Sequence, residues 1–171
     1  MATALVVIDV QQGLFSEAEV YRGDEVLAAI RALQDRARAA GLPVLHVQHD
    51  GGPGDSLARG SVGFAIHDEV APLTGEEIVV KTRCDAFFRT ELDAKLKARG
   101  IERLVMAGLQ TEYCIDTSVR SAMSHGYKVV LASDAHSTFD SPDLKAADIT
   151  AHHNRVLRSF AEIVPAAEIA L

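Results

Sequence analysis

The sequence predicts an α/β fold of three layers, with helices on both faces of a six-stranded, mostly parallel sheet. Short runs rich in Val, Ile and Leu alternate along the chain with longer runs whose apolar residues have helical spacing. Such alternation is typical of βαβ units, in which parallel strands are buried on both faces. The chain has 171 residues, of which 48% are hydrophobic, and this is enough to bury a sizeable core. We therefore expect a single domain over residues 1–171.

The first half of the chain provides three of the expected strands. Residues 5–10 are apolar on both faces of an extended segment, and residues 43–47 and 78–81 are further short apolar runs. Between the first two, residues 24–40 have apolar side chains at helical spacing, and a glycine follows them as at many helix C-termini. The glycine-rich residues 51–63 are expected to form the main surface loop.

The second half of the chain alternates helices and strands in the same way. Thr90 is followed by Asp93 at the spacing of a capping box, which predicts a helix start. Ser141 precedes Pro142, as an N-cap serine precedes a proline at the first helical position. The expected helices cover residues 90–100, 114–125 and 141–159, and the expected strands cover residues 102–107, 128–133 and 161–164.

Composition and charge argue against several classes of function. The net charge is -7 at pH 7, and no basic stripe is present to neutralise nucleic-acid phosphates or to bind an anionic membrane. The first residues lack the basic region of a signal peptide, and no run is long and apolar enough to span a bilayer. A disulfide between Cys84 and Cys114 is not expected without an export signal. We therefore expect a cytoplasmic protein without nucleic-acid or membrane partners.

Cys114 is a candidate nucleophile. It follows an apolar run over residues 104–107, a glycine and a short polar turn, and it precedes a segment with helical spacing. This order places the thiol near a helix N-terminus, where the helix dipole stabilises an anion and favours a thiolate. The structural alternative, a small buried hydrophobe, is the commoner fate of a cysteine. Taken alone, the residue leaves both interpretations open.

Two further ionisable residues follow apolar runs in the same manner. Asp9 ends the first expected strand and Lys81 ends the third, while Cys114 follows the fourth. In an open parallel sheet, sites collect at the carboxyl ends of the strands. Each residue also has a plain interpretation, since an aspartate can cap a strand end and a lysine can be solvated. The coincidence at three strand ends favours a site with a base, a cation and a nucleophile.

The motifs around these residues resemble a known family. In their order and spacing they are similar to those of the isochorismatase-like cysteine hydrolases, which include nicotinamidases, N-carbamoylsarcosine amidohydrolases and streptothricin-hydrolase-like proteins. The resemblance covers essentially the whole chain and implies the strand order 3-2-1-4-5-6. The matching segments are Leu5 to Gln11, Val80-Lys81, Asp85 to Leu92, Ala107 to Ile115 and Val130 to Ala135.

The resemblance implies a catalytic triad of Asp9, Lys81 and Cys114. It also implies a cis peptide between Leu109 and Gln110, with the backbone N–H groups of Gln110 and Cys114 forming an oxyanion hole. The expected reaction is cleavage of a C–N bond in a small amide, ureide or lactam-like substrate through a thioester. A homo-oligomer, a dimer or larger, is expected from the same resemblance.

Two other functions remain as alternatives. One is hydrolysis of the vinyl ether of isochorismate, which does not use the cysteine in the resembling family. The other is a non-catalytic thiol protein that binds a partner, against which the presence of Asp9 and Lys81 argues. No glycine-rich phosphate loop and no Gly-x-Ser-x-Gly elbow occurs, so we expect neither a nucleotide cofactor nor a serine hydrolase.

We expect no metal site. Nicotinamidase-like members of the family carry an Asp-x-His start to a metal site, whereas here Asp50 follows His46 and His49. The two histidines are three residues apart on a strand and should therefore point to opposite faces.

Two aromatic residues are candidates for the wall of a substrate pocket. Phe15 comes soon after the first strand, and Tyr113 precedes the nucleophile and could point inward or outward. We predict substrate-binding roles for both.

Overall fold

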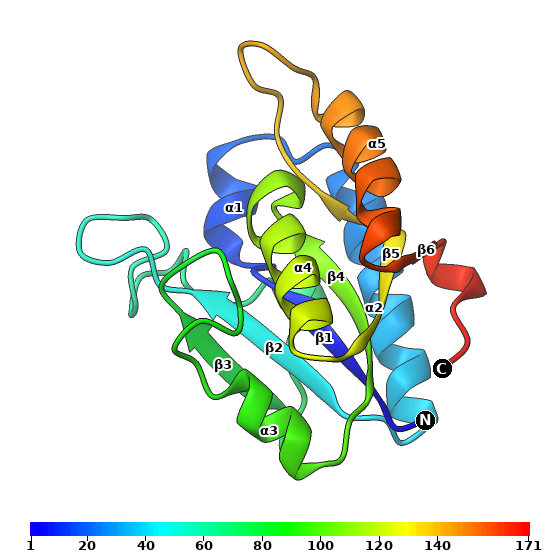
Figure 1. Cartoon of the computed structure of the whole chain (residues 1–171). Coiled ribbons are helices and arrows are strands. Elements are labelled where there is room, and N and C mark those ends of the chain that lie inside the picture. Colours follow the sequence, from blue (N-terminus) through cyan, green and yellow to red (C-terminus); the bar gives the residue numbers. More distant parts are fainter.

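A computed structural model describes residues 1–171 and contains the expected sheet of six strands, in the order β3-β2-β1-β4-β5-β6 (Figure 1). Every pair of neighbouring strands is parallel. The order and direction of the strands confirm the predicted fold class. The strands are β1 Thr3–Ile8, β2 Val44–His49, β3 Glu77–Lys81, β4 Arg103–Leu109, β5 Lys128–Ser137 and β6 Glu162–Val164.

Helices complete the three layers. The first helix was not predicted, because six residues are too few to show a helical period. None of the helices is both long and apolar enough to cross a lipid bilayer. The helices are α1 Gln12–Glu17, α2 Gly23–Ala39, α3 Leu92–Ala98, α4 Asp116–Ser124 and α5 Ala146–Val156, with a π-helical turn at Thr111–Ile115 and short 3-10 turns at Asp68–Val70, Leu157–Ser159 and Ala166–Glu168.

The hydrophobic core has two halves, one on each face of the sheet. Side chains of a strand alternate between the faces, and those of β1 divide accordingly. Ala4, Val6 and Ile8 belong to the half that includes residues of α3 and α4. Leu5 and Val7 belong to the half that includes residues of α2. Figure 1 shows α2 behind the sheet, with α3 and α4 in front of it. Apolar side chains fill both faces of β1, so the first ionisable residue of this segment, Asp9, lies just beyond the end of the strand.

The last helix begins later than the sequence predicts. Ser141 and Pro142 are not its first residues, since α5 starts at Ala146. The Ser141 hydroxyl accepts a hydrogen bond from the Leu144 N–H and so closes a separate turn. Asp140 Oδ1 accepts from the Ala146 N–H at 2.9 Å. The side chain that binds a free N–H group at the start of this helix is therefore that of Asp140 and not that of Ser141.

The predicted capping box at α3 is also wrong. The helix begins at Leu92, whose N–H donates to Thr90 Oγ1 at 3.3 Å. Asp93 does not reach back to the preceding backbone, because its two oxygens bind the Lys97 ammonium and the Tyr127 hydroxyl. A tertiary contact with Tyr127 thus replaces the local one that the spacing suggested.

Gly108 allows β4 to pass close to β1. Its φ is +131°, a conformation that side-chain-bearing residues rarely adopt, and an added Cβ would lie 2.0 Å from the Ile8 carbonyl oxygen. The pairing of β4 with β5 also shifts register between Met106 and Gly108. The ends of β1 and β4 are therefore held together immediately before the segments that carry Asp9 and Cys114.

We expect Gly108→Ala to lower the free energy of unfolding by more than about 2 kcal/mol, because the new methyl group meets backbone and the conformation is strained. Gly75→Ala is the matched control, since Gly75 has φ +93° and nothing lies within 4 Å of the added Cβ. That control should cost only about 1 kcal/mol of backbone strain. Urea denaturation measures both values, and equal losses would contradict the steric role of Gly108.

Candidate active site

Three strand ends bring the predicted triad together. Asp9 directly follows β1, Lys81 is the last residue of β3, and Cys114 lies in the π-helical turn after β4. Lys81 Nζ is 2.6 Å from Asp9 Oδ2 and 3.1 Å from Cys114 Sγ. Lys81 is 1% exposed, Asp9 2% and Cys114 9%. Cys114 is thus the most exposed residue of the three.

The backbone fixes the direction of the Asp9 carboxylate. Asp9 has φ +53°, in the left-handed region, which aspartate tolerates better than most residues with side chains. Its N–H donates to the Val47 carbonyl at 2.8 Å, so the end of β1 stays attached to β2. Such a conformation costs on the order of 1–3 kcal/mol and persists where its surroundings hold it.

Gln11 connects the end of β1 to two neighbouring segments. Its side-chain amide donates to the carbonyls of His49 and Phe64 at 3.0 and 2.9 Å, and its Oε1 accepts from the His49 N–H at 2.7 Å. Gln48 Nε2 donates to the same Phe64 carbonyl at 2.7 Å. The end of β2 and the loop after it are therefore fixed to the strand that carries Asp9.

His49 is a member of this cluster that the sequence analysis did not place there. Its Nδ1 lies 3.1 Å from Lys81 Nζ, and the two residues are register partners in the β2·β3 pair. As predicted, His46 points to the opposite face, where its ring contacts Gln34 of α2 and Glu76. The rule that selected Asp9 and Lys81 also applies to His49, because it is the last residue of β2.

Burial and mutual attraction shift the pKa values of the triad. Burial raises the pKa of the Asp9 carboxyl, against the opposing effects of Lys81 and Cys114. Burial and then the Asp9 charge raise the pKa of the Cys114 thiol, although Lys81 acts to lower it. Burial lowers the pKa of Lys81, but Asp9 and Cys114 together outweigh it, so the net shift is upward. Burial and the Asp9 charge therefore oppose the stabilisation of a thiolate that the sequence analysis expects near a helix N-terminus.

The resting site consequently holds one cation and one anion. A carboxyl group is intrinsically a stronger acid than a thiol, so we assign the single proton that these two groups share to sulfur. Asp9 is a carboxylate, Lys81 an ammonium and Cys114 a neutral thiol. Removing the thiol proton to solvent would leave a buried net negative charge, whereas passing it to Asp9 would not.

The turn that carries Cys114 has a free backbone donor. The peptide bond between Leu109 and Gln110 is cis. The Gln110 carbonyl accepts from the N–H groups of Tyr113 and Ile115, whereas the Gln110 N–H donates to no protein group. Its assignment to an oxyanion hole with the Cys114 N–H remains a prediction.

Side chains from the end of β5 hold the same turn from the other side. His136 Nδ1 lies 2.8 Å from Thr111 Oγ1, and its Nε2 lies 2.9 Å from Asn154 Oδ1. The Asn154 amide donates to the Ser133 carbonyl, so its oxygen is the acceptor for His136 Nε2–H. Nδ1 is then free to accept from the Thr111 hydroxyl. A neutral, buried imidazole thus connects β5 to the residue that follows Gln110.

Asp9, His49 and Cys114 could together bind a metal ion only if the Lys81 side chain moved out of the space between them. Asp9, His49 and Cys114 each present a ligand atom, and these atoms lie within 4.8 Å of one another. The Lys81 ammonium contacts all three of these residues. The cation that the structure places among them is therefore a lysine side chain.

The two aromatic residues proposed for substrate binding lie in different places. The Phe15 ring packs 4.8 Å from the His67 ring and borders a shallow cleft beside Glu19 and Arg22. Tyr113 is 53% exposed, on the rim of a cleft of about 480 Å³ that Leu144 and other residues of the α5 side also line. Neither cleft is lined by a triad residue, and the substrate roles of Phe15 and Tyr113 remain predictions.

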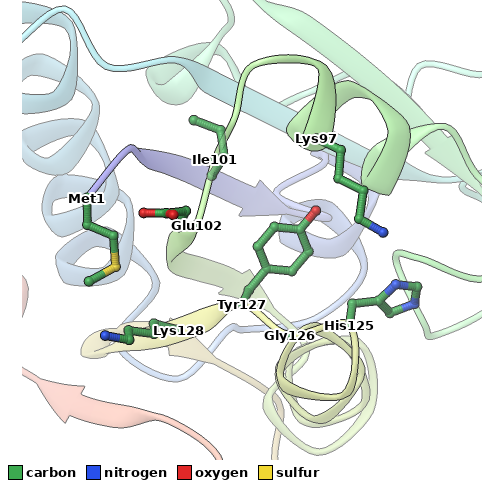
Figure 2. A pocket seen from close by; sticks show the side chains of 8 residues that line it. All are labelled: Met1, Lys97, Ile101, Glu102, His125, Gly126, Tyr127 and Lys128. Atoms are coloured by element: carbon green, nitrogen blue, oxygen red, sulfur yellow. The ribbon is translucent and has the colours of Figure 1, made fainter.

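A cavity of about 350 Å³ at the amino ends of the strands lies away from this chemistry (Figure 2). Met1 precedes β1, Glu102 precedes β4 and Lys128 opens β5, so the cavity is at the opposite edge of the sheet from the triad. It is not a candidate for the active site.

The fold and the buried aspartate, lysine and cysteine define the chain as an α/β protein with a thiol-based site at a parallel sheet edge. A family model described as the isochorismatase domain matches residues 3–168. The chain belongs to the isochorismatase family.

Similar proteins include several named hydrolases. The chain is 42% identical over 140 residues to a streptothricin hydrolase of Streptomyces noursei, covering 81% of this chain and 51% of that protein. It is 32% identical over 170 residues to the ureidoacrylate amidohydrolase RutB of Agrobacterium fabrum, covering 78% of this chain and 75% of that one. The crystal structure of a cysteine hydrolase from Pseudomonas syringae pv. phaseolicola superposes with a TM-score of 0.90 at 27% identity, covering 98% and 90% of the two chains. The chain spans about half the length of the streptothricin hydrolases that it matches.

The His136 contacts predict a pH dependence of stability. Burial lowers the pKa of His136 from 6.5 to about 4, so protons bind the unfolded chain more readily than the folded one between these values. Its contribution to stability is present above pH 6.5 and is lost as the pH falls towards 4, by about 3 kcal/mol in total.

The measurement compares urea unfolding of the wild type with that of His136→Gln from pH 7 to pH 4. The wild type should lose more stability over this range than the variant, because other titrating groups are common to both. Parallel curves would show that folding does not lower the pKa of His136.

Proposed function

We propose that this chain is a cofactor-independent cysteine hydrolase that cleaves a C–N bond in a small amide, ureide or lactam-like substrate. The observation that carries the proposal is the contact of one buried ammonium with both a carboxylate and a thiol. The names of the streptothricin hydrolase and the ureidoacrylate amidohydrolase support a reaction of this class.

The first step transfers a proton from sulfur to carboxylate. Asp9 accepts the proton of Cys114 while Lys81 stays charged, so the buried site keeps its net charge. The thiolate then attacks the substrate carbonyl carbon, a C–S bond forms, and the carbonyl electron pair moves to oxygen. Backbone N–H groups of Gln110 and Cys114 would stabilise this oxyanion, and losing one such donor typically costs about 100-fold or more in rate.

The second step expels the amine and leaves a thioester. Asp9 gives its proton to the leaving nitrogen as the C–N bond breaks, and becomes a carboxylate again. It can then accept a proton from a water molecule that attacks the thioester carbonyl. The C–S bond breaks, a carboxylic acid forms, and the proton returns from Asp9 to sulfur. Asp9 thus acts as base, acid, base and acid in turn.

A panel of small amides, ureides and lactams, with release of ammonia or amine as the readout, tests the reaction class. Isochorismate belongs in the panel as the substrate of the alternative vinyl-ether hydrolysis. Turnover of an amide with a thioester visible by mass spectrometry supports the proposal. Turnover of isochorismate alone, undiminished in Cys114→Ala, would replace it with the alternative.

Cys114→Ala should fold and lose turnover by at least about 1,000-fold, because no other group can form the covalent intermediate. Cys84→Ala is the matched control, since Cys84 is exposed and unpaired, and it should retain activity. The measurement is kcat for each variant, with a thermal melt to confirm folding. Full activity of Cys114→Ala would show that the nucleophile has been misassigned.

A further inference from the structure

A buried ammonium group has three N–H donors to satisfy. Lys81 is 1% exposed, so water cannot be its general partner. Asp9 Oδ2 forms an ion pair with the ammonium at 2.6 Å, and Cys114 Sγ accepts a hydrogen bond from it at 3.1 Å. The third nearby acceptor is His49 Nδ1, also at 3.1 Å. Three groups that can accept a hydrogen bond therefore surround the three N–H donors of the ammonium.

This arrangement fixes the protonation state of His49. Nδ1 can accept from the Lys81 ammonium only when it carries no proton, so the proton of the neutral ring lies on Nε2. Burial and then the Lys81 charge lower the pKa of His49, against the opposing effects of Asp9, Asp55 and Asp50. A neutral imidazole is thus the form that its surroundings favour at neutral pH.

Hydrogen bonds also fix the main chain of His49. His49 is the register partner of Lys81 across the β2·β3 pair, which places the two side chains next to each other on one face. Gln11 binds both the N–H and the carbonyl of His49. The same glutamine lies two residues from Asp9, so one side chain sets the spacing between the carboxylate strand and the imidazole.

We propose that His49 is a positioning residue of the active site, whose neutral ring accepts the third ammonium proton and keeps Lys81 Nζ between Asp9 and Cys114. This role rests on the proposed function, because it matters for turnover only if Cys114 is the nucleophile. When the thiol gives its proton to Asp9, the ammonium must stay beside the new thiolate. Without an acceptor at position 49, one buried N–H would be unmet and the ammonium would be free to move from the sulfur.

The contact itself can be tested without any substrate. Imidazole ¹⁵N shifts of the labelled wild-type protein at pH 7, assigned by comparison with His49→Asn, report the tautomer of each histidine. We expect His49 to be neutral, with its proton on Nε2. A proton on Nδ1, or a charged imidazolium, would overturn the proposal whatever the activity of the enzyme.

The role in turnover is tested with two replacements. His49→Leu removes the acceptor and should lower kcat on the order of 10- to 100-fold with little change in KM, as expected for an unmet buried donor. It should also move the alkaline limb of the pH profile to lower pH, because the Lys81 ammonium loses a partner. His49→Asn places an amide oxygen near the former Nδ1 and should restore most of both properties.

His125→Leu and His125→Asn form the matched control pair, since His125 lies at the opposite edge of the sheet (Figure 2), and both should behave as wild type. Equal rates for His49→Leu, His49→Asn and the wild type would overturn the proposal. If His49→Leu fails to fold, the tautomer and the rate of His49→Asn still decide it. An active Cys114→Ala would instead overturn the proposed function. The ¹⁵N measurement would still test the contact between His49 and Lys81, because it does not depend on activity.

Discussion

The Lys81 ammonium balances one negative charge inside the protein, and two neighbouring groups compete to carry that charge. Asp9 and Cys114 both contact the same nitrogen, yet only one of them can be ionised without leaving the buried site negatively charged. The proton can therefore pass from one group to the other without changing the net charge of the buried site. In the proposed reaction, this constraint lets a thiol with a raised pKa act as a nucleophile, because Asp9 is close enough to accept its proton.

The fold supplies this geometry through the ends of parallel strands. β1, β3 and β4 each end at the same edge, and the close approach of Gly108 to Ile8 brings the first and the fourth segments together. Gln11 then attaches β2 and the following loop to the strand that carries Asp9. Neighbouring strands on both sides pair with β1 and β4, and this pairing fixes the positions at which Asp9 and the turn that carries Cys114 begin.

The alternation of short apolar runs with helical ones was sufficient to predict a parallel sheet and the strand ends that carry Asp9 and Lys81, whereas the strand order came from the family resemblance. The contact between His49 and Lys81 depends on the register of β2 against β3, which no local pattern records. The raised pKa of Cys114 depends on burial by distant segments and on Asp9. The start of α5 was misplaced for a similar reason, since Asp140 binds Ala146 across a turn.

Ultraviolet absorbance of the thiolate during a pH titration tests the shared charge most directly, with Cys84→Ala as the background so that Cys114 is the only thiol. Because Asp9 raises the pKa of Cys114 and Lys81 lowers it, adding Asp9→Asn should move the titration of Cys114 to lower pH while turnover is lost. The thiolate would then form more readily in the inactive protein than in the active one. A midpoint that stays in place or moves to higher pH would contradict the account.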